Sequence, residues 1–175
     1  MTTHALFPLD PSLDLVLDRV VDVSPRLVWA AWTRPDLLMQ WFCPRPWKLV
    51  DCRLDLRPGG DFSTVMQGPD GQSFAMTGCY LELVENERLV FTDAMKPGFR
   101  PILPSREPGA VKLGVMAPLM FTAIVQFIPE GTGTRYYVTA VHGNAAIRQK
   151  HAEMGFDHGW AAALDQLVEL MQGKA

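Results

Sequence analysis

Residues 145–172 read AAIRQKHAEMGFDHGWAAALDQLVELMQ, and their length and apolar spacing predict one long C-terminal helix. One stripe of this helix carries large apolar residues, which are expected to form its core face: Phe156, Trp160, Leu164, Leu167 and Met171. Small residues lie beside that stripe: Ala152, Gly155, Gly159 and Ala162. A glycine inside a helix costs about 1 kcal/mol relative to alanine. The two glycines therefore indicate a close approach to a sheet or a hollow beneath the helix.

The chain before this helix predicts an antiparallel sheet. Alternating apolar residues over 13–23 predict a strand with one buried face, and Ser24-Pro25 begins two short helices over 26–33 and 35–41. Turn signals then separate strands expected at 47–56, 61–67, 73–84, 88–94, 118–128 and 134–141. This order (strand, two helices, six strands, helix) predicts an α+β fold, in which a curved antiparallel sheet wraps around the terminal helix. Such a concave apolar space is a typical ligand site.

We expect a single domain over residues 1–175, with its core over about 13–172. The chain has 175 residues, 48% of them hydrophobic, and shows no internal repeat or evident linker. The segment 95–117 is rich in proline and glycine, which predicts an irregular loop. Loops of this length are often lids or binding loops.

Charge and composition exclude several classes of protein. Sixteen Lys and Arg against nineteen Asp and Glu give a net charge of −3, which argues against a nucleic-acid partner. The most apolar stretch, 113–128, is interrupted by Pro118 and Gln126, so no membrane association is expected. The first ten residues do not resemble a signal peptide, and three cysteines without a CxxC pair predict reduced thiols. A cytoplasmic location follows.

Several motifs resemble those of a known superfamily. Residues 23–33, VSPRLVWAAWT, resemble the opening of the START-like (SRPBCC, helix-grip) superfamily, in its branch related to the activator of the ninety-kilodalton heat-shock protein's ATPase. Further matching motifs follow in order: Trp41-Phe42, Arg57–Gly60, Asp70-Gly71, Glu87–Val90, Gly133–Arg135 and Gly159-Trp160. Residues 151–156 resemble the signature of a bacterial subgroup. The resemblance implies the helix-grip fold and the binding of lipids, hormones or polyketides.

Large and soft side chains share the strand faces that are predicted to lie opposite the helix. We expect them to bind a hydrophobic or amphipathic small molecule, with the 95–117 segment as a partial lid. The expected ligand-binding residues are Trp41, Phe62, Met66, Phe74, Met76, Phe91, Phe121, Val125, His142, Phe156 and Trp160. A simple packed core is the alternative at each position.

The resemblance also admits an enzyme, such as a polyketide cyclase or aromatase, which would position its substrate with the aid of a few polar groups. The candidate catalytic residues are His142, Asp93 and Tyr80. His142 lies either near the mouth of the cavity or as a structural histidine inside the fold. Asp93 is either a perturbed acid or base, or a cap for the loop after its strand.

The remaining histidines predict neither a metal site nor a cofactor. His151 and His158 are seven residues apart on a helix face that the helical wheel places opposite Trp160, largely toward solvent or a partner. Zinc needs three or four convergent ligands, which this spacing does not guarantee. Exposed Met154 and Ile147 on the second face of the helix are compatible with a homodimer. A module that contacts a chaperone through the outer face of the sheet is the third hypothesis, which the family's name implies.

Overall fold

The computed structural model describes residues 4–174. The first strand, β1 (Asp14–Val21), leads into α1 (Pro25–Thr33) and α2 (Pro35–Trp41). The strands predicted from the turn signals then follow as β2 (Lys48–Leu54), β3 (Asp61–Gln67), β4 (Ser73–Val84), β5 (Arg88–Thr92), β10 (Phe121–Glu130) and β11 (Gly133–His142). The chain closes with α3 (Ala145–Glu153) and α4 (Phe156–Gln172). The predicted α+β element order is therefore confirmed.

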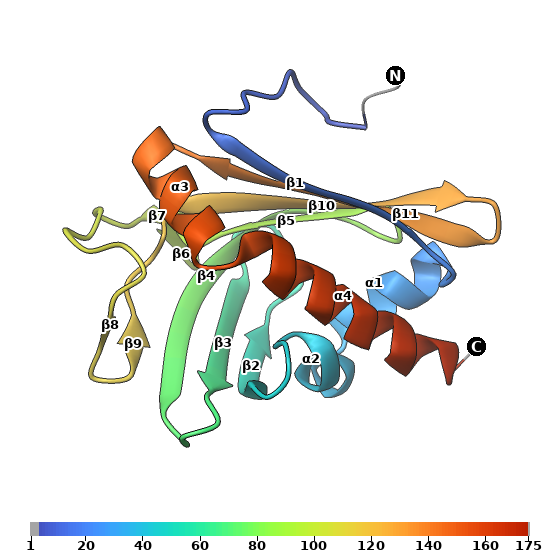
Figure 1. Ribbon diagram of the computed structural model, residues 1–175, viewed down its shortest axis with the longest axis horizontal. Helices are drawn as coiled ribbons and strands as arrows, with labels where there is room; N and C mark the ends of the chain where they lie inside the picture. The colour runs from blue at the N-terminus through green and yellow to red at the C-terminus, as the bar shows by residue number, and fades with distance from the viewer. Residues whose placement is uncertain (1–3, 175) are drawn as a thin grey trace.

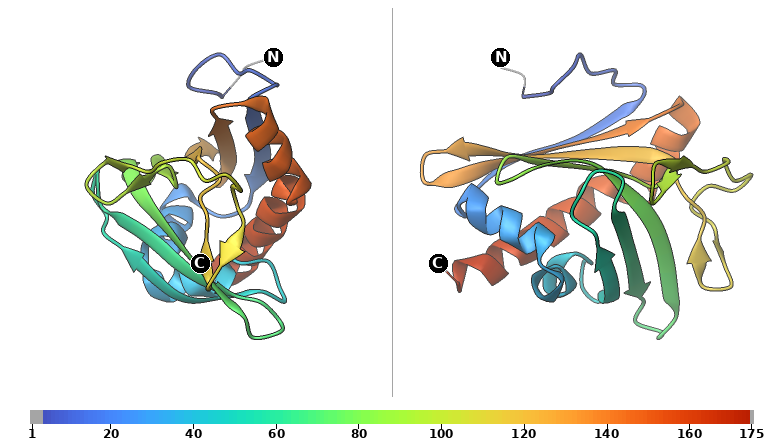
Figure 2. Two further views of the ribbon diagram at one scale, coloured as in Figure 1. Left: turned by 90° about the vertical axis from the view of Figure 1, so that its left-hand side faces the viewer. Right: turned by 180° about the vertical axis from the view of Figure 1, so that it is seen from behind.

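The strands form a strongly curled sheet in the order β1-β11-β10-β5-β4-β3-β2, with antiparallel pairing along this path. The register shifts between Leu49 and Asp51 and again between Tyr80 and Glu82. Such bulges bend a strand and increase its twist, which helps the sheet to curl. Figures 1 and 2 show α4 running through the concave side of the sheet, with α1 and α2 near its C-terminal half. This is the helix-grip arrangement.

The predicted core face of α4 is confirmed. Phe156, Leu164, Leu167 and Met171 are each at most 2% exposed, and Trp160 is half-buried against the same core. They pack against inward-facing strand residues, which include Leu15, Phe62, Phe91, Val125 and Tyr136. The apolar alternation of the strands and the apolar stripe of the helix thus account for one continuous core.

The C-terminal helix differs from the prediction of one continuous element. Gly155 has φ +92°, a left-handed conformation that a helix interior does not contain, so α3 ends at Glu153 and α4 begins at Phe156. A single helical wheel drawn through both helices therefore assigns the wrong face to residues on one side of the joint. The prediction that His151 faces solvent is wrong, because the side chain is buried and hydrogen-bonded to His142.

The 95–117 segment is also more regular than predicted. It contains two short hairpins, formed by β6 (Met95–Lys96) with β7 (Arg100–Pro101) and by β8 (Val111–Lys112) with β9 (Val115–Met116). Gly98 and Gly114 supply positive φ values at the turns. The Ala75 N–H donates to the Gly114 carbonyl at 2.7 Å, which attaches β9 to the sheet alongside β4. The segment projects from one end of the sheet, at the left of Figure 1.

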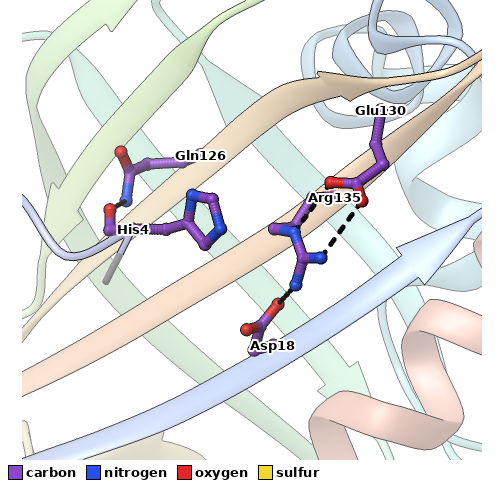
Figure 3. A network of polar contacts seen from close by, with 5 residues as sticks. All are labelled: His4, Asp18, Gln126, Glu130 and Arg135. Carbon is purple, nitrogen blue, oxygen red and sulfur yellow. Dashed lines mark hydrogen bonds and ion pairs between the residues drawn. The ribbon is translucent and has the colours of Figure 1, made fainter. Parts of the chain in front are cut away.

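The outer face of the sheet carries a polar network (Figure 3). The Arg135 guanidinium donates to Glu130 on the neighbouring strand and to Asp18 on β1, each at 2.9 Å. The Gln126 amide donates to the His4 carbonyl at 2.9 Å, so the N-terminal segment is attached over this face. The apolar side of the sheet is thus the concave one, which faces α4. No helix within residues 4–174 has the length and apolar character needed to cross a membrane.

Candidate functional site

A cavity of about 370 Å³ lies between the concave face of the sheet and α4. Its walls come from α1, α2 and the chain that follows them, from β3, β4, β5 and the start of β10, from the end of the 95–117 segment, and from the α3–α4 joint and the first half of α4. The lining residues are Trp32, Trp41, Phe42, Cys43, Pro44, Trp47, Met66, Met76, Phe91, Met116, Leu119, Phe121, His151, Met154, Gly155, Phe156, Gly159, Trp160 and Ala163. The walls are almost entirely apolar, and the volume falls in the range of small-molecule sites.

Most residues predicted to bind a ligand line this cavity. They are Trp41, Met66, Met76, Phe91, Phe121, Phe156 and Trp160. The remaining predicted residues lie behind the wall or beside it. Phe62 and Val125 are fully buried in the core, Phe74 packs against Trp47 with ring centroids 5.5 Å apart, and His142 lies behind His151.

Trp32 and Trp41 both line the cavity. Their ring centroids lie 5.0 Å apart at an interplanar angle of 74°. The Trp32 indole N–H donates to the Tyr136 hydroxyl at 3.2 Å, and the Trp41 indole N–H donates to the Ala31 carbonyl at 3.0 Å. Because both N–H groups are already bonded within the protein, this wall offers apolar contact rather than hydrogen bonds.

Gln166 fixes another wall to α4. Its side-chain amide donates to the carbonyls of Trp41 at 2.9 Å and Cys43 at 2.8 Å, and its Oε1 accepts from the Arg45 N–H at 2.9 Å. Gln166 is not among the residues predicted to form the site. Its only signal in the sequence is a single amide on the apolar face of α4, close to Leu164 and Leu167. These three hydrogen bonds hold the segment after α2, which forms this wall of the cavity, in place without a ligand.

Two histidines form a buried pair at the α3 end of the cavity. His142 Nδ1 lies 2.7 Å from the Leu13 carbonyl, and His142 Nε2 lies 2.8 Å from His151 Nδ1. The His151 ring also packs edge-on against Phe121, with centroids 4.7 Å apart. Burial, with a smaller contribution from His142, lowers the pKa of His151 to about 4, and burial likewise lowers the pKa of His142. Both rings are therefore neutral at pH 7.

Asp93 anchors the point where the 95–117 segment returns to the sheet. Its carboxylate accepts from the Leu119 N–H at 2.6 Å and from the Phe121 N–H at 2.9 Å, and its side chain is buried. Burial raises the pKa of Asp93 to about 6, against the opposing effect of these N–H donors. This placement agrees with the structural alternative, in which Asp93 caps the loop that follows its strand.

Tyr80 is buried on β4, and its hydroxyl has no hydrogen-bond partner within residues 4–174. Burial raises its pKa. None of the three residues considered for catalysis, His142, Asp93 and Tyr80, lines the cavity. Cys43 does line it, and burial raises the pKa of its thiol to about 12, so the sulfur stays protonated and unreactive.

Within the described part of the chain, no three His, Cys, Asp or Glu residues gather closely enough to hold a metal ion. The His142–His151 pair has no carboxylate or thiol as a third ligand. The arrangement can enclose an apolar molecule and offer it one imidazole.

Comparisons with known proteins agree with this fold. A crystal structure of a protein from Nitrosomonas europaea shares 41% sequence identity and superposes with a TM-score of 0.84, covering 95% of this chain and 98% of that chain. A solution structure from Arthrobacter aurescens (22% identity, TM-score 0.75) covers 98% of this chain and 93% of that chain. An AHSA1-like protein from Aeromonas hydrophila (22% identity, TM-score 0.65) covers 93% of this chain and 94% of that chain. No curated protein matches the chain.

The family comparison covers nearly the whole fold. The family model described as "Activator of Hsp90 ATPase homolog 1-like protein" matches residues 22–172, which run from the end of β1 to the end of α4. The matched residues include α1, α2, the sheet from β2 onward and the complete cavity wall. The chain therefore belongs to the family of activator of Hsp90 ATPase homolog 1-like proteins.

Proposed function

We propose that this protein binds a hydrophobic or amphipathic small molecule in the cavity between its sheet and α4. The observation that carries the proposal is the cavity itself, whose walls are aromatic, aliphatic and thioether side chains with a single imidazole. Gln166 holds one wall to α4, and this order lowers the conformational cost of binding. The superfamily that the sequence resembles includes binders of lipids, hormones and polyketides, which supports the same conclusion.

The methionines suit such a ligand site, because thioether side chains adapt to irregular shapes. Met66 and Met76 contribute from the sheet, Met116 from β9 and Met154 from the α3–α4 joint. A ligand that removes about 200 Å² of its own surface and a similar area of wall from water gains about 10 kcal/mol, of which association takes back several. We therefore expect affinities in the micromolar range for a well-matched compound.

Gly159 provides the most direct test. It lines the cavity, and a Cβ atom built there meets no heavy atom of the described residues within 4 Å. A leucine at this position would extend into the space that the ligand needs without a clash at its Cβ. His158 is exposed in the same helical turn and does not line the cavity, so His158→Leu adds the same apolar side chain outside it.

The probe is N-phenyl-1-naphthylamine, a neutral apolar compound whose fluorescence rises on transfer from water. We expect saturable binding to the wild type and to His158→Leu, and at least about tenfold weaker binding to Gly159→Leu, because the leucine occupies ligand volume. Circular dichroism and thermal unfolding verify that both variants are folded. Absence of saturable binding to the wild type, or unchanged binding to Gly159→Leu, would contradict the proposal.

A further inference from the structure

One cavity-lining side chain among the described residues can accept a strong hydrogen bond from a ligand. Tryptophan side chains only donate, and the sulfur atoms of methionine and cysteine are weak acceptors. Among the described lining side chains, His151 alone carries a nitrogen or oxygen that can accept. The proton positions on His151 therefore decide which polar group a ligand can present there.

The hydrogen bonds behind His151 fix those protons. The Leu13 carbonyl can only accept, so His142 Nδ1 carries the proton and donates to it at 2.7 Å. In the neutral ring His142 Nε2 is then an acceptor, so His151 Nδ1 carries a proton and donates it in a hydrogen bond to His142 Nε2 at 2.8 Å. His151 Nε2 is left without a proton, and it has no hydrogen-bond partner in the described part of the chain. A backbone carbonyl at the start of β1 thus sets the tautomer of a residue at the cavity.

The surroundings keep this arrangement neutral. Phe121 and Phe156 pack edge-on against the His151 ring, with centroid distances of 4.7 and 5.2 Å. Of the charged groups nearby, Asp14 favours and Arg148 disfavours a positive charge on His142. Burial is the largest influence on both rings and lowers the pKa of each, so at pH 7 both are neutral and His151 Nε2 is a bare acceptor.

We propose that His151 Nε2 accepts a hydrogen bond from a hydroxyl group of the bound molecule, so that the cavity selects apolar alcohols and phenols over their ethers and ketones. This inference rests on the proposed binding function. An ether or ketone oxygen would place its lone pairs against the lone pair of Nε2 and leave both unsatisfied. A carboxylate placed against Nε2 would lose hydration and gain no donor from this ring.

The test compares 2-naphthol with 2-methoxynaphthalene, which share the apolar ring system and differ in the hydroxyl proton. Each displaces N-phenyl-1-naphthylamine from the wild type, from His151→Phe and from His158→Phe, the same change at an exposed position outside the cavity. Because one neutral hydrogen bond is worth about 0.5 to 1.5 kcal/mol, the preference for the naphthol should fall by about two- to tenfold in His151→Phe. It should be unchanged in His158→Phe.

Nitrogen-15 NMR of the wild-type histidine side chains gives a readout that needs no variant to fold. We expect His151 Nδ1 to be protonated and Nε2 bare, and the Nε2 signal to shift with 2-naphthol but not with 2-methoxynaphthalene. A protonated Nε2, or an equal preference for 2-naphthol in the wild type and His151→Phe, overturns this inference. Binding of the probe to the wild type would in that case still support the cavity proposal. If neither the probe nor the naphthalenes bind the wild type, both proposals fall.

Discussion

Gln166 and His151 show how single polar residues organise an apolar site. Both lie on the buried sides of their helices, and both bond to partners in other elements: Gln166 to backbone groups after α2, and His151 Nδ1 to His142 on β11. Helical periodicity identifies the buried side of a helix, but it carries no information about partners in other elements. For this reason the aromatic and methionine residues of the wall could largely be predicted from the sequence, whereas these two polar residues could not.

Replacing Gln166 with leucine should destabilise the protein. The substitution keeps an apolar volume but leaves the carbonyls of Trp41 and Cys43 and the Arg45 N–H without their partners. We expect the free energy of unfolding to fall by about 2 to 4 kcal/mol, since each buried polar group that loses its bond costs about 1 to 3 kcal/mol. Urea unfolding measures this, with Gln172→Leu, the same change at an exposed position of the same helix, as the control. A loss below about 0.5 kcal/mol for Gln166→Leu would show that the amide does not hold the wall.

His151 should make stability depend on pH. Its pKa is about 4 when folded and 6.5 in the unfolded reference, so the folded state favours the neutral ring. The contribution of neutral His151 to the free energy of unfolding is fully present above pH 6.5. It is lost as the pH falls toward 4, because the unfolded chain then binds a proton that the folded protein does not. We expect the wild type to lose about 3 kcal/mol over this window relative to His151→Phe, since one pKa unit corresponds to about 1.4 kcal/mol. Urea unfolding at several pH values provides the measurement. Parallel pH profiles for the two proteins would disprove the shift.

At the scale of elements, two glycines one turn apart have opposite roles. Gly155 has φ +92° and separates α3 from α4, whereas Gly159 lies inside α4 with ordinary helical geometry. The sequence predicts the same role for both glycines, a close approach to the sheet or a hollow beneath the helix, because a single sequence does not reveal which glycine has a positive φ. The 95–117 segment is more regular than its composition predicts for a related reason. Gly98 and Gly114 make the turns of two short hairpins within it.

Alanine at these two glycines should change stability in opposite directions. Gly155→Ala should lower the free energy of unfolding by about 1 to 2 kcal/mol, since a left-handed conformation strains any residue with a Cβ. Gly159→Ala should raise it by up to about 1 kcal/mol through its better helix propensity. Neither added Cβ meets a heavy atom of the described residues within 4 Å, so packing does not obscure the comparison. Thermal and urea unfolding measure both, and a shift of the same sign in the two variants would contradict the broken-helix geometry.

At the scale of the whole molecule, the fold follows closely from local patterns. Period-two apolar faces, turn signals and an amphipathic terminal helix leave few ways to bury all the apolar surfaces, and the curled sheet around α4 is one that does. The cavity follows less directly, because it depends on how side chains from distant elements fill the space. Large side chains from the sheet and α2 line the cavity together with Gly155 and Gly159. Because these glycines have no side chain to fill it, the space beneath this part of the helix remains open.

The most direct test of ligand binding is methyl NMR of protein labelled with [methyl-¹³C]methionine, titrated with N-phenyl-1-naphthylamine. The lining methionines are Met66, Met76, Met116 and Met154. Met39, on α2, and Met171, near the end of α4, do not line the cavity and serve as internal controls. The structure predicts that the four lining signals shift together and saturate with one equivalent, while the control signals stay in place. Unchanged lining signals, or shifts confined to Met39 and Met171, would contradict a ligand site between the sheet and α4.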